Sequence, residues 1–116
     1  MKYDLEDRLI KFASAVIEVS ESLPEKKSSH HLAGQLVRSG TAPALIYGEA
    51  QAAESRNDFI HKMKIALKEL RETSICLRII ELRQFTHAGD VPALLRENIE
   101  LIAIFVKSIN TASSSK

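Results

Sequence analysis

Residues 33 to 73 read AGQLVRSGTAPALIYGEAQAAESRNDFIHKMKIALKELRET, and this stretch decides the fold. Its first arm holds three of the chain's four glycines, one proline and several alanines, whereas its second arm is densely charged around an apolar stripe. A glycine in a helix interior costs about 1 kcal/mol relative to alanine, so this crowding indicates a close-packed helix. Ser55, between the arms, is a good N-cap. The stretch therefore predicts a helical hairpin.

Two further segments flank the hairpin and share its three-four apolar rhythm. The first runs from an Asp4 N-cap to about Leu23, and the second begins at Asp90 and carries Pro92 in its first turn. The hairpin arms run from Ser28 or Ser29 to about residue 53, and from residue 55 to about 84. Short turns join all four segments, which favours antiparallel neighbours. We predict an all-α fold, an antiparallel up-down-up-down four-helix bundle.

Composition supports a single helical domain over residues 1–110, with a disordered polar tail over 111–116. Apolar residues make up 45% of the chain but aromatics only 5%, which suits helices packed through aliphatic side chains. The single Cys76 excludes an internal disulfide, and with no signal-peptide pattern at the N-terminus we expect a cytoplasmic protein. No apolar run approaches the roughly 20 residues that a membrane-spanning helix needs, so no membrane partner is expected.

The net charge of +1 conceals an uneven distribution. Residues 1–25 carry three Lys/Arg against six Asp/Glu, whereas residues 56–83 carry seven against four. These charges form either a salt-bridged solvent face or a basic strip that meets phosphate, and an oligomer would repeat such a strip. On the second interpretation the candidate nucleic-acid-binding residues are Arg38, Arg56, Lys62, Lys64, Lys68 and Arg71.

A second apolar stripe accompanies the core stripe of the third segment, and the fourth segment is apolar around most of its circumference. A helix in a monomeric bundle needs one apolar face, so the excess must be covered by another helix or another subunit. We therefore predict a homo-oligomer. The residues expected at its interface are Ile75, Ile79, Leu82, Leu101, Ile104 and Phe105.

Polar residues also gather near the hairpin turn, where core packing does not require them. The cluster consists of Glu49, Glu54 and His61 beside the cations already named, and it forms either a buried polar network or an exposed site.

Catalysis is the least supported class of function, and no catalytic residue, metal, cofactor or small-molecule substrate is predicted. Asp58 and His61 make one Asp-x-x-His pair, whereas a di-metal bundle site needs two Glu-x-x-His motifs. The glycines are not spaced as in a phosphate-binding loop. Cys76 has no local activating signature.

The chain resembles the four-helix-bundle proteins of the 23S rRNA-intervening sequence family. The resemblance rests on QLVRSGTAPA at 35–44, YGEAQAAES at 47–55, DFIHK at 58–62 and ALKELRET at 66–73, and DLEDRL at 4–9 also suits it. It implies an antiparallel bundle assembled into a ring, commonly a homopentamer, and kinship with bundle proteins that bind nucleic acid. It implies no catalytic residues.

Two functions are therefore carried forward. The first is a non-enzymatic oligomeric bundle that acts as an RNA-associated, or more generally nucleic-acid-associated, or scaffolding factor. The alternative is a protein–protein interaction adaptor with no nucleic-acid role.

Overall fold

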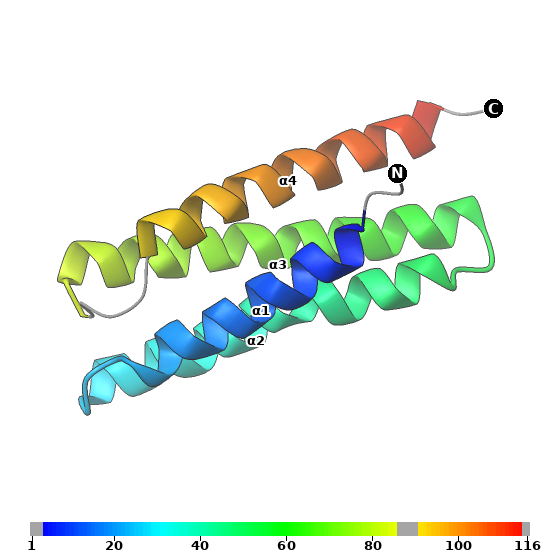
Figure 1. Ribbon diagram of the computed structural model, residues 1–116. Coiled ribbons are helices and arrows are strands. Elements are labelled where there is room, and N and C mark those ends of the chain that lie inside the picture. Colours follow the sequence, from blue (N-terminus) through cyan, green and yellow to red (C-terminus); the bar gives the residue numbers. More distant parts are fainter. Residues whose placement is uncertain (1–3, 86–90, 115–116) are drawn as a thin grey trace.

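The computed structural model describes residues 4–85 and 91–114, and these form four helices without a strand (Figure 1). The helices are α1 (Leu5–Glu21), α2 (Lys27–Gln51), α3 (Arg56–Arg83) and α4 (Val91–Ser114). The prediction of an all-α, four-helix protein is confirmed. Helix α2 begins one residue before the expected Ser28 and ends two residues before residue 53.

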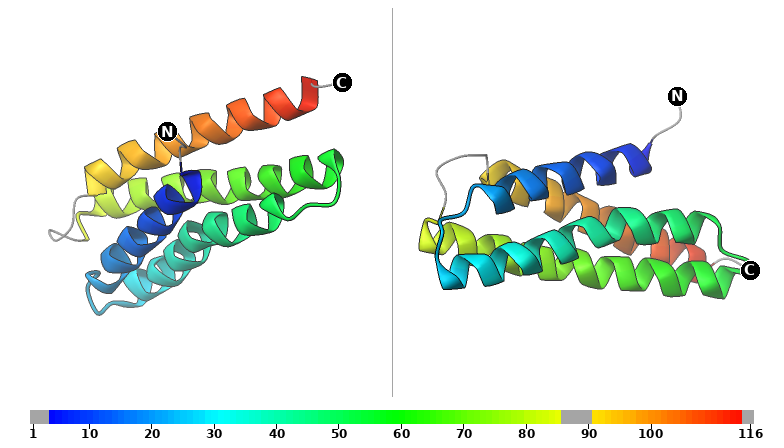
Figure 2. Two further views of the ribbon diagram at one scale, coloured as in Figure 1. Left: turned by 45° about the vertical axis from the view of Figure 1, so that its right-hand side comes forward. Right: turned by 90° about the horizontal axis from the view of Figure 1, so that it is seen from below.

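The helices pack around a common axis in the order of the sequence. Helix α2 packs on both α1 and α3, α3 packs on α4, and the contact that returns from α4 to α1 is the least extensive. In the described residues the backbones of α1 and α3 do not come close to each other, so the two helices lie on one diagonal of the bundle and meet only through side chains in the core. Figure 2 shows that α4 runs at an angle to α1.

Local signals place the helix starts. The Asp4 carboxylate accepts a hydrogen bond of 3.1 Å from the Asp7 N–H, and the Ser55 hydroxyl accepts one of 3.0 Å from the Asp58 N–H. Both predicted N-caps are confirmed, because each side chain satisfies an N–H that the helix leaves unpaired. Pro92 lies in the first turn of α4 as expected. The proposed Asp90 cap lies outside the described residues.

The end of α4 corrects one prediction. The helix continues through Ser114, whose hydroxyl donates to the Thr111 carbonyl at 3.3 Å. Residues 111–114 are therefore the last helical turn and not part of a disordered tail, because polar residues on a helix that is already formed can extend it into solvent. Residues 115 and 116 lie outside the described part of the chain.

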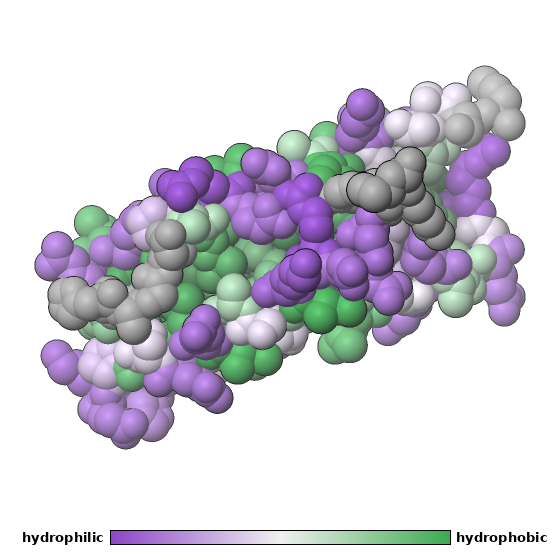
Figure 3. Space-filling view, in the orientation of Figure 1, coloured by the Kyte–Doolittle hydropathy of each residue, from purple (hydrophilic) through white to green (hydrophobic). Residues whose placement is uncertain are grey.

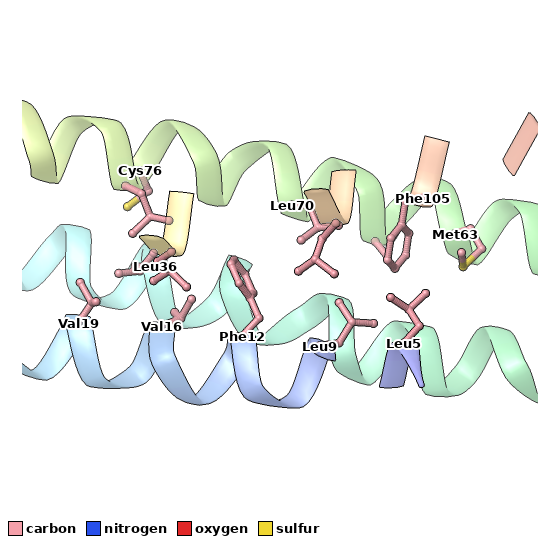
Figure 4. Close-up of a cluster of buried hydrophobic side chains, with 14 of the residues drawn as sticks. Leu5, Leu9, Phe12, Val16, Val19, Leu36, Met63, Leu70, Cys76 and Phe105 are labelled. Carbon is pink, nitrogen blue, oxygen red and sulfur yellow. The ribbon is translucent and has the colours of Figure 1, made fainter. Parts of the chain in front are cut away.

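The core is aliphatic and continuous along the bundle axis. Figure 4 shows Leu9 and Phe12 of α1 pointing into the core on the side where Leu70 of α3 points, and Val16 pointing toward the region of Leu36 of α2. Gly40 of α2 lies so close to Val16 that an added Cβ would come within 2.6 Å of a Val16 methyl. This glycine permits the close approach of α1 and α2, and it agrees with the close-packed helix that the crowded glycines indicated, although the sequence did not identify α1 as the neighbour.

Among the buried polar side chains of the described residues, Ser39, Thr73 and Asn98 make contacts between helices. Thr73 Oγ1 lies 2.9 Å from Ser39 Oγ and 2.8 Å from the Glu69 carbonyl, so α2 and α3 share a hydroxyl contact. Asn98 of α4 is fully buried and its amide donates to the Leu70 carbonyl at 3.2 Å. Its Oδ1 has no hydrogen-bond partner among the described residues. Polar contacts between helices fix their register where aliphatic packing alone would allow sliding.

Candidate functional site

The face of α3 that points away from the core is divided into a basic half and an apolar half. Met63, Leu70 and Leu77 face inward with no exposed surface, and the residues that project on the opposite side follow the same three-four spacing. We call the first half the α3 basic strip, which comprises Lys64, Lys68 and Arg71, and the second the α3 apolar strip, which comprises Ile75, Ile79 and Leu82.

The α3 basic strip presents three exposed cations on two successive turns. Lys64, Lys68 and Arg71 border an open hollow of about 380 Å³ together with Leu67, Glu72 and Ile75. Within the described residues no carboxylate lies within 4.0 Å of their charged nitrogens. These three members of the predicted nucleic-acid-binding set therefore carry charges that no carboxylate of the described residues neutralises.

Arg38 belongs to a different arrangement. Its guanidinium donates to Glu69 at 2.9 Å and to Glu72 at 2.5 Å, and this fork joins α2 to α3. Hydrogen bonding to Glu72, and then to Glu69, raises the pKa of Arg38 above its ordinary value. Two carboxylates therefore compensate the Arg38 charge, and the guanidinium holds the hairpin together while half of it stays exposed.

Lys62 is also paired across the hairpin. Its ammonium donates to Glu49 at 2.9 Å, and this hydrogen bond raises the pKa of Lys62. Glu54 lies exposed in the turn between α2 and α3, and His61 is exposed on α3. Of the two interpretations of the polar cluster, the structure therefore corresponds to the exposed one, and it joins Glu49 to Lys62 in an ion pair. Arg56, the sixth predicted cation, is exposed at the start of α3.

The α3 apolar strip is exposed to an extent that is unusual for aliphatic residues. Ile75 is 53% exposed, Ile79 42% and Leu82 84%. Hollows flank the strip on both sides, one of about 630 Å³ that includes Arg78 and Glu81, and one of about 560 Å³ that reaches Leu32 of α2.

The other half of the predicted subunit interface is corrected. Leu101 and Phe105 have no exposed surface, and Phe105 meets Tyr47 in an edge-to-face contact with ring centroids 6.1 Å apart. Both side chains belong to the core, because α4 turns this side of its apolar circumference inward. Ile104 is partly buried and packs against the same core.

Other exposed features have no counterpart in the sequence predictions. Arg8 of α1 donates to Glu97 at 2.6 Å and to Glu100 at 3.0 Å, which ties α1 to α4 beside an apolar groove of about 370 Å³. Figure 3 shows apolar surface between these two helices, bordered by hydrophilic residues. Glu97 and Glu100, three residues apart on one helix face, were the only sequence signal for this pairing. Large aliphatic residues are also exposed elsewhere, at Ile10, Ile17, Leu45 and Ile99.

The described residues offer little evidence for a nucleophilic cysteine or for a metal-binding site. Burial raises the pKa of the Cys76 thiol, whose Sγ lies 3.6 Å from the Leu32 carbonyl, and the protonated thiol is a poor nucleophile. No group of three or more potential metal ligands occurs in residues 4–85 and 91–114. None of the helices described is long and apolar enough to cross a membrane.

The fold and the surface define the class of protein: a four-helix, all-α protein whose third helix exposes aliphatic side chains and three cations that no carboxylate of residues 4–85 and 91–114 pairs. The model of the 23S rRNA-intervening sequence protein family matches residues 2–107, so the chain belongs to that family.

Among solved structures, the chain is similar to the crystal structure, at 1.70 Å resolution, of a protein of unknown function from the S23 ribosomal protein family of Bacteroides thetaiotaomicron VPI-5482. The two share 26% identity with a TM-score of 0.83, over 91% of this chain and 98% of that one. Among curated proteins no match is found.

Proposed function

We propose that this protein is a non-enzymatic, homo-oligomeric four-helix bundle that associates with RNA through the α3 basic strip. The observation that carries the proposal is the contrast among its cations. Arg38 and Lys62 are held by carboxylates, whereas Lys64, Lys68 and Arg71 are exposed without a carboxylate partner in the described residues. Unpaired cations on one face attract a phosphate backbone, because binding releases the counterions condensed on the nucleic acid.

Three cations on one chain give weak binding, and self-association would strengthen it. Each phosphate contact to a single strand contributes about −0.7 to the slope of log K against log salt, so one strip contributes about −2. A ring repeats the strip once per subunit and raises the effective local concentration of cations. We therefore propose that the chain, an up-down-up-down bundle, associates with copies of itself, and the exposed α3 apolar strip supports this self-association. We further propose a pentameric ring as the form of the assembly, on the ground of the family resemblance.

The family description indicates a first ligand to test, and the single cysteine bears on the cellular compartment. The matched family is described as 23S rRNA-intervening sequence protein, which makes structured ribosomal RNA a reasonable first ligand to test. The only cysteine is free and buried, as is usual in a reducing compartment, so we place the protein in the cytoplasm.

The test is a binding titration with a structured RNA fragment across a salt series. The test variant replaces Lys64, Lys68 and Arg71 with glutamine. The control variant replaces three other exposed cations, Lys26, Lys27 and Lys107, and so changes the net charge by the same amount. We expect the test variant to weaken binding at least tenfold at low salt and to make the salt slope shallower by about 2 per strip in contact, and the control to retain both.

Two outcomes contradict the RNA proposal. One is the absence of binding by the natural sequence at low salt. The other is an equal loss of affinity in the test and control variants, which would mean that net charge and not the α3 basic strip determines binding. The self-association part is tested separately, by sedimentation of the natural sequence at micromolar concentration, where a monomer would contradict it.

A second candidate function is a protein–protein adaptor, and the exposed α3 apolar strip favours it. In that case a partner protein and not another copy covers Ile75, Ile79 and Leu82. Affinity capture before and after nuclease treatment separates the two functions. Partners that leave on nuclease digestion favour RNA association, whereas partners that remain and are lost in Ile79→Asp favour the adaptor.

A further inference from the structure

A second exposed apolar strip lies on α1, the helix that is diagonally opposite α3 in the bundle. Ile10 is 51% exposed and Ile17 is 39% exposed, and a separation of seven residues places both on one face of the helix. One turn beyond each end lie exposed carboxylates, Glu6 before Ile10 and Glu21 after Ile17. We call these four residues the α1 strip.

The charges on the two edges of α1 differ. The cations of this helix, Arg8 and Lys11, both line the groove toward α4, and Arg8 is bound there by Glu97 and Glu100. The α1 strip lies on the other edge, and its flanking charges are carboxylates. It is therefore an apolar surface bracketed by negative charge.

The α3 apolar strip is bracketed by positive charge. Arg78 lies between Ile75 and Ile79 in the sequence, and Arg71 lies one turn before Ile75. Both arginines are exposed. Of the nearby carboxylates, Glu72 is engaged by Arg38, while Glu81 borders the hollow beside Arg78. The cations thus exceed the carboxylates left without a partner along this half of α3.

The two strips match in length as well as in charge. Ile10 to Ile17 and Ile75 to Leu82 each span seven residues, which corresponds to about 10 Å of helix at about 1.5 Å per residue. A contact between them buries aliphatic side chains on both sides and brings opposite charges to the edges. Complementary charge of this kind selects one partner surface over others.

Contacts between identical strips are less favourable. Two α3 strips related by a two-fold axis would bring Arg78 of one copy toward Arg78 of the other, and two α1 strips would bring carboxylates together. Like charges at an interface cost free energy and suppress such pairings. The charge pattern therefore favours a contact between different surfaces of two copies.

We propose that the copies associate head to tail, with the α3 apolar strip of one copy docked on the α1 strip of the next. The inference rests on the self-association proposed above and names its two surfaces. Because α1 and α3 occupy opposite corners of the bundle, each copy can engage two neighbours at once. A contact between different surfaces closes into a ring or continues as a filament, and it does not stop at a dimer.

Charge reversal tests the pairing. Variant X carries Glu6→Lys and Glu21→Lys, and variant Y carries Arg71→Glu and Arg78→Glu. Sedimentation velocity is measured on the natural sequence, on X, on Y and on an equimolar mixture of X and Y. We expect X alone and Y alone to associate at least tenfold more weakly than the natural sequence. The mixture should regain association as X–Y heterodimers and longer alternating chains, because the basic α3 of X meets the acidic α1 of Y, and the acidic α3 of Y meets the basic α1 of X. A ring of five cannot alternate throughout, so the mixture is expected to assemble without restoring a closed pentamer.

The outcomes separate this inference from the proposed function. If X alone assembles as the natural sequence does, α1 is not the docking surface, although self-association stands. A mixture that stays monomeric while the natural sequence assembles overturns the inference in the same way. A natural sequence that is monomeric at every concentration overturns self-association itself.

Cross-linking provides a second measurement that does not depend on charge reversal. In a Cys76→Ser background, one population carries Ile17→Cys and another carries Ile79→Cys, and the two are mixed with a bis-maleimide. We expect a heterodimeric cross-linked product. The matched control mixes Ile99→Cys on α4 with Ile79→Cys and should give none. Cross-linking of the Ile79→Cys population with itself in preference to the mixed product would overturn the head-to-tail contact.

Discussion

Three glycines in α2 respond differently to alanine, and this difference tests how closely α1 and α2 approach. A Cβ added at Gly40 would lie 2.6 and 2.8 Å from the two methyl carbons of Val16 and 3.1 Å from its Cβ. A Cβ added at Gly34 or Gly48 would meet no atom within 4 Å. The perturbation is therefore the same methyl group at three positions of one helix, with a steric cost at only one of them.

The expected magnitude follows from two effects. Alanine gains about 1 kcal/mol over glycine in a helix interior, and this gain is common to all three positions. An extra methyl group in a well-packed core costs about 1 to 3 kcal/mol. Rotation of Val16 cannot relieve the clash completely, because the 3.1 Å contact to its Cβ does not depend on the rotamer. Gly34→Ala and Gly48→Ala should each stabilise by up to about 1 kcal/mol, and Gly40→Ala should be less stable than either by about 1 to 3 kcal/mol.

The differences in free energy of unfolding are measured by urea unfolding of the three variants, at one protein concentration below the onset of self-association. They should appear as shifts in the urea midpoint, with no change in the slope of the free energy of unfolding against urea concentration. A difference of 1 kcal/mol corresponds to about 4 °C in melting temperature for a chain of this size. The double variant Gly40→Ala with Val16→Ala should be more stable than the sum of its single changes predicts, by about 0.5 to 3 kcal/mol. Equal stabilisation by all three alanines would refute the close packing of α1 on α2.

Three further predictions concern the core. Leu101→Ala and Phe105→Ala should destabilise the chain by about 2 to 5 kcal/mol in urea unfolding, whereas Leu82→Ala should change the stability of the monomer by less than about 0.5 kcal/mol. Similar costs for all three variants would contradict the burial of Leu101 and Phe105 and the exposure of Leu82. Asn98→Leu should be neutral or stabilising by about 1 kcal/mol, since it removes a buried oxygen without a partner among the described residues. Because burial raises the pKa of Cys76, the folded state keeps its proton at a pH where the unfolded state has lost it. Stability should therefore fall as pH rises above about 8.5, and less so in Cys76→Ala.

Helix starts were predictable where a local side chain determines them. Asp4 and Ser55 cap α1 and α3 through bonds to residues three positions on, and sequence alone contains that information. The start of α2 has no such signal, since its cap residue Lys26 makes no side-chain capping bond. Ser29, which the sequence offered as a possible start, is instead buried inside the first turns of the helix.

The orientation of α4 was not predictable from periodicity. Apolar residues surround most of this helix, so several faces could point inward with similar hydrophobic gain. The fold buries Asn98 completely and leaves the adjacent Ile99 60% exposed, which reverses the usual preference of each residue type. Packing against α3 decides the outcome, and it moved Leu101 and Phe105 from the expected interface into the core.

The division among the cations depends on the same kind of information. Whether Arg38 reaches Glu69 and Glu72 is set by the register of α2 against α3, over a separation of more than thirty residues. Sequence could identify six cations as candidates but not which of them the fold would neutralise.

The two proposed uses of α3 are compatible because they occupy different lengths of one helix. Lys64 and Ile75, the near end of the α3 apolar strip, are eleven residues apart, or about 16 Å along the axis at about 1.5 Å per residue. This distance exceeds the Debye length of about 8 Å at physiological ionic strength, so a copy docked on the α3 apolar strip has little electrostatic effect on Lys64. Arg71 lies only one turn from Ile75 and belongs to both surfaces. Docking of a copy beside it would change the environment of this one cation, and through it self-association and RNA binding would influence each other.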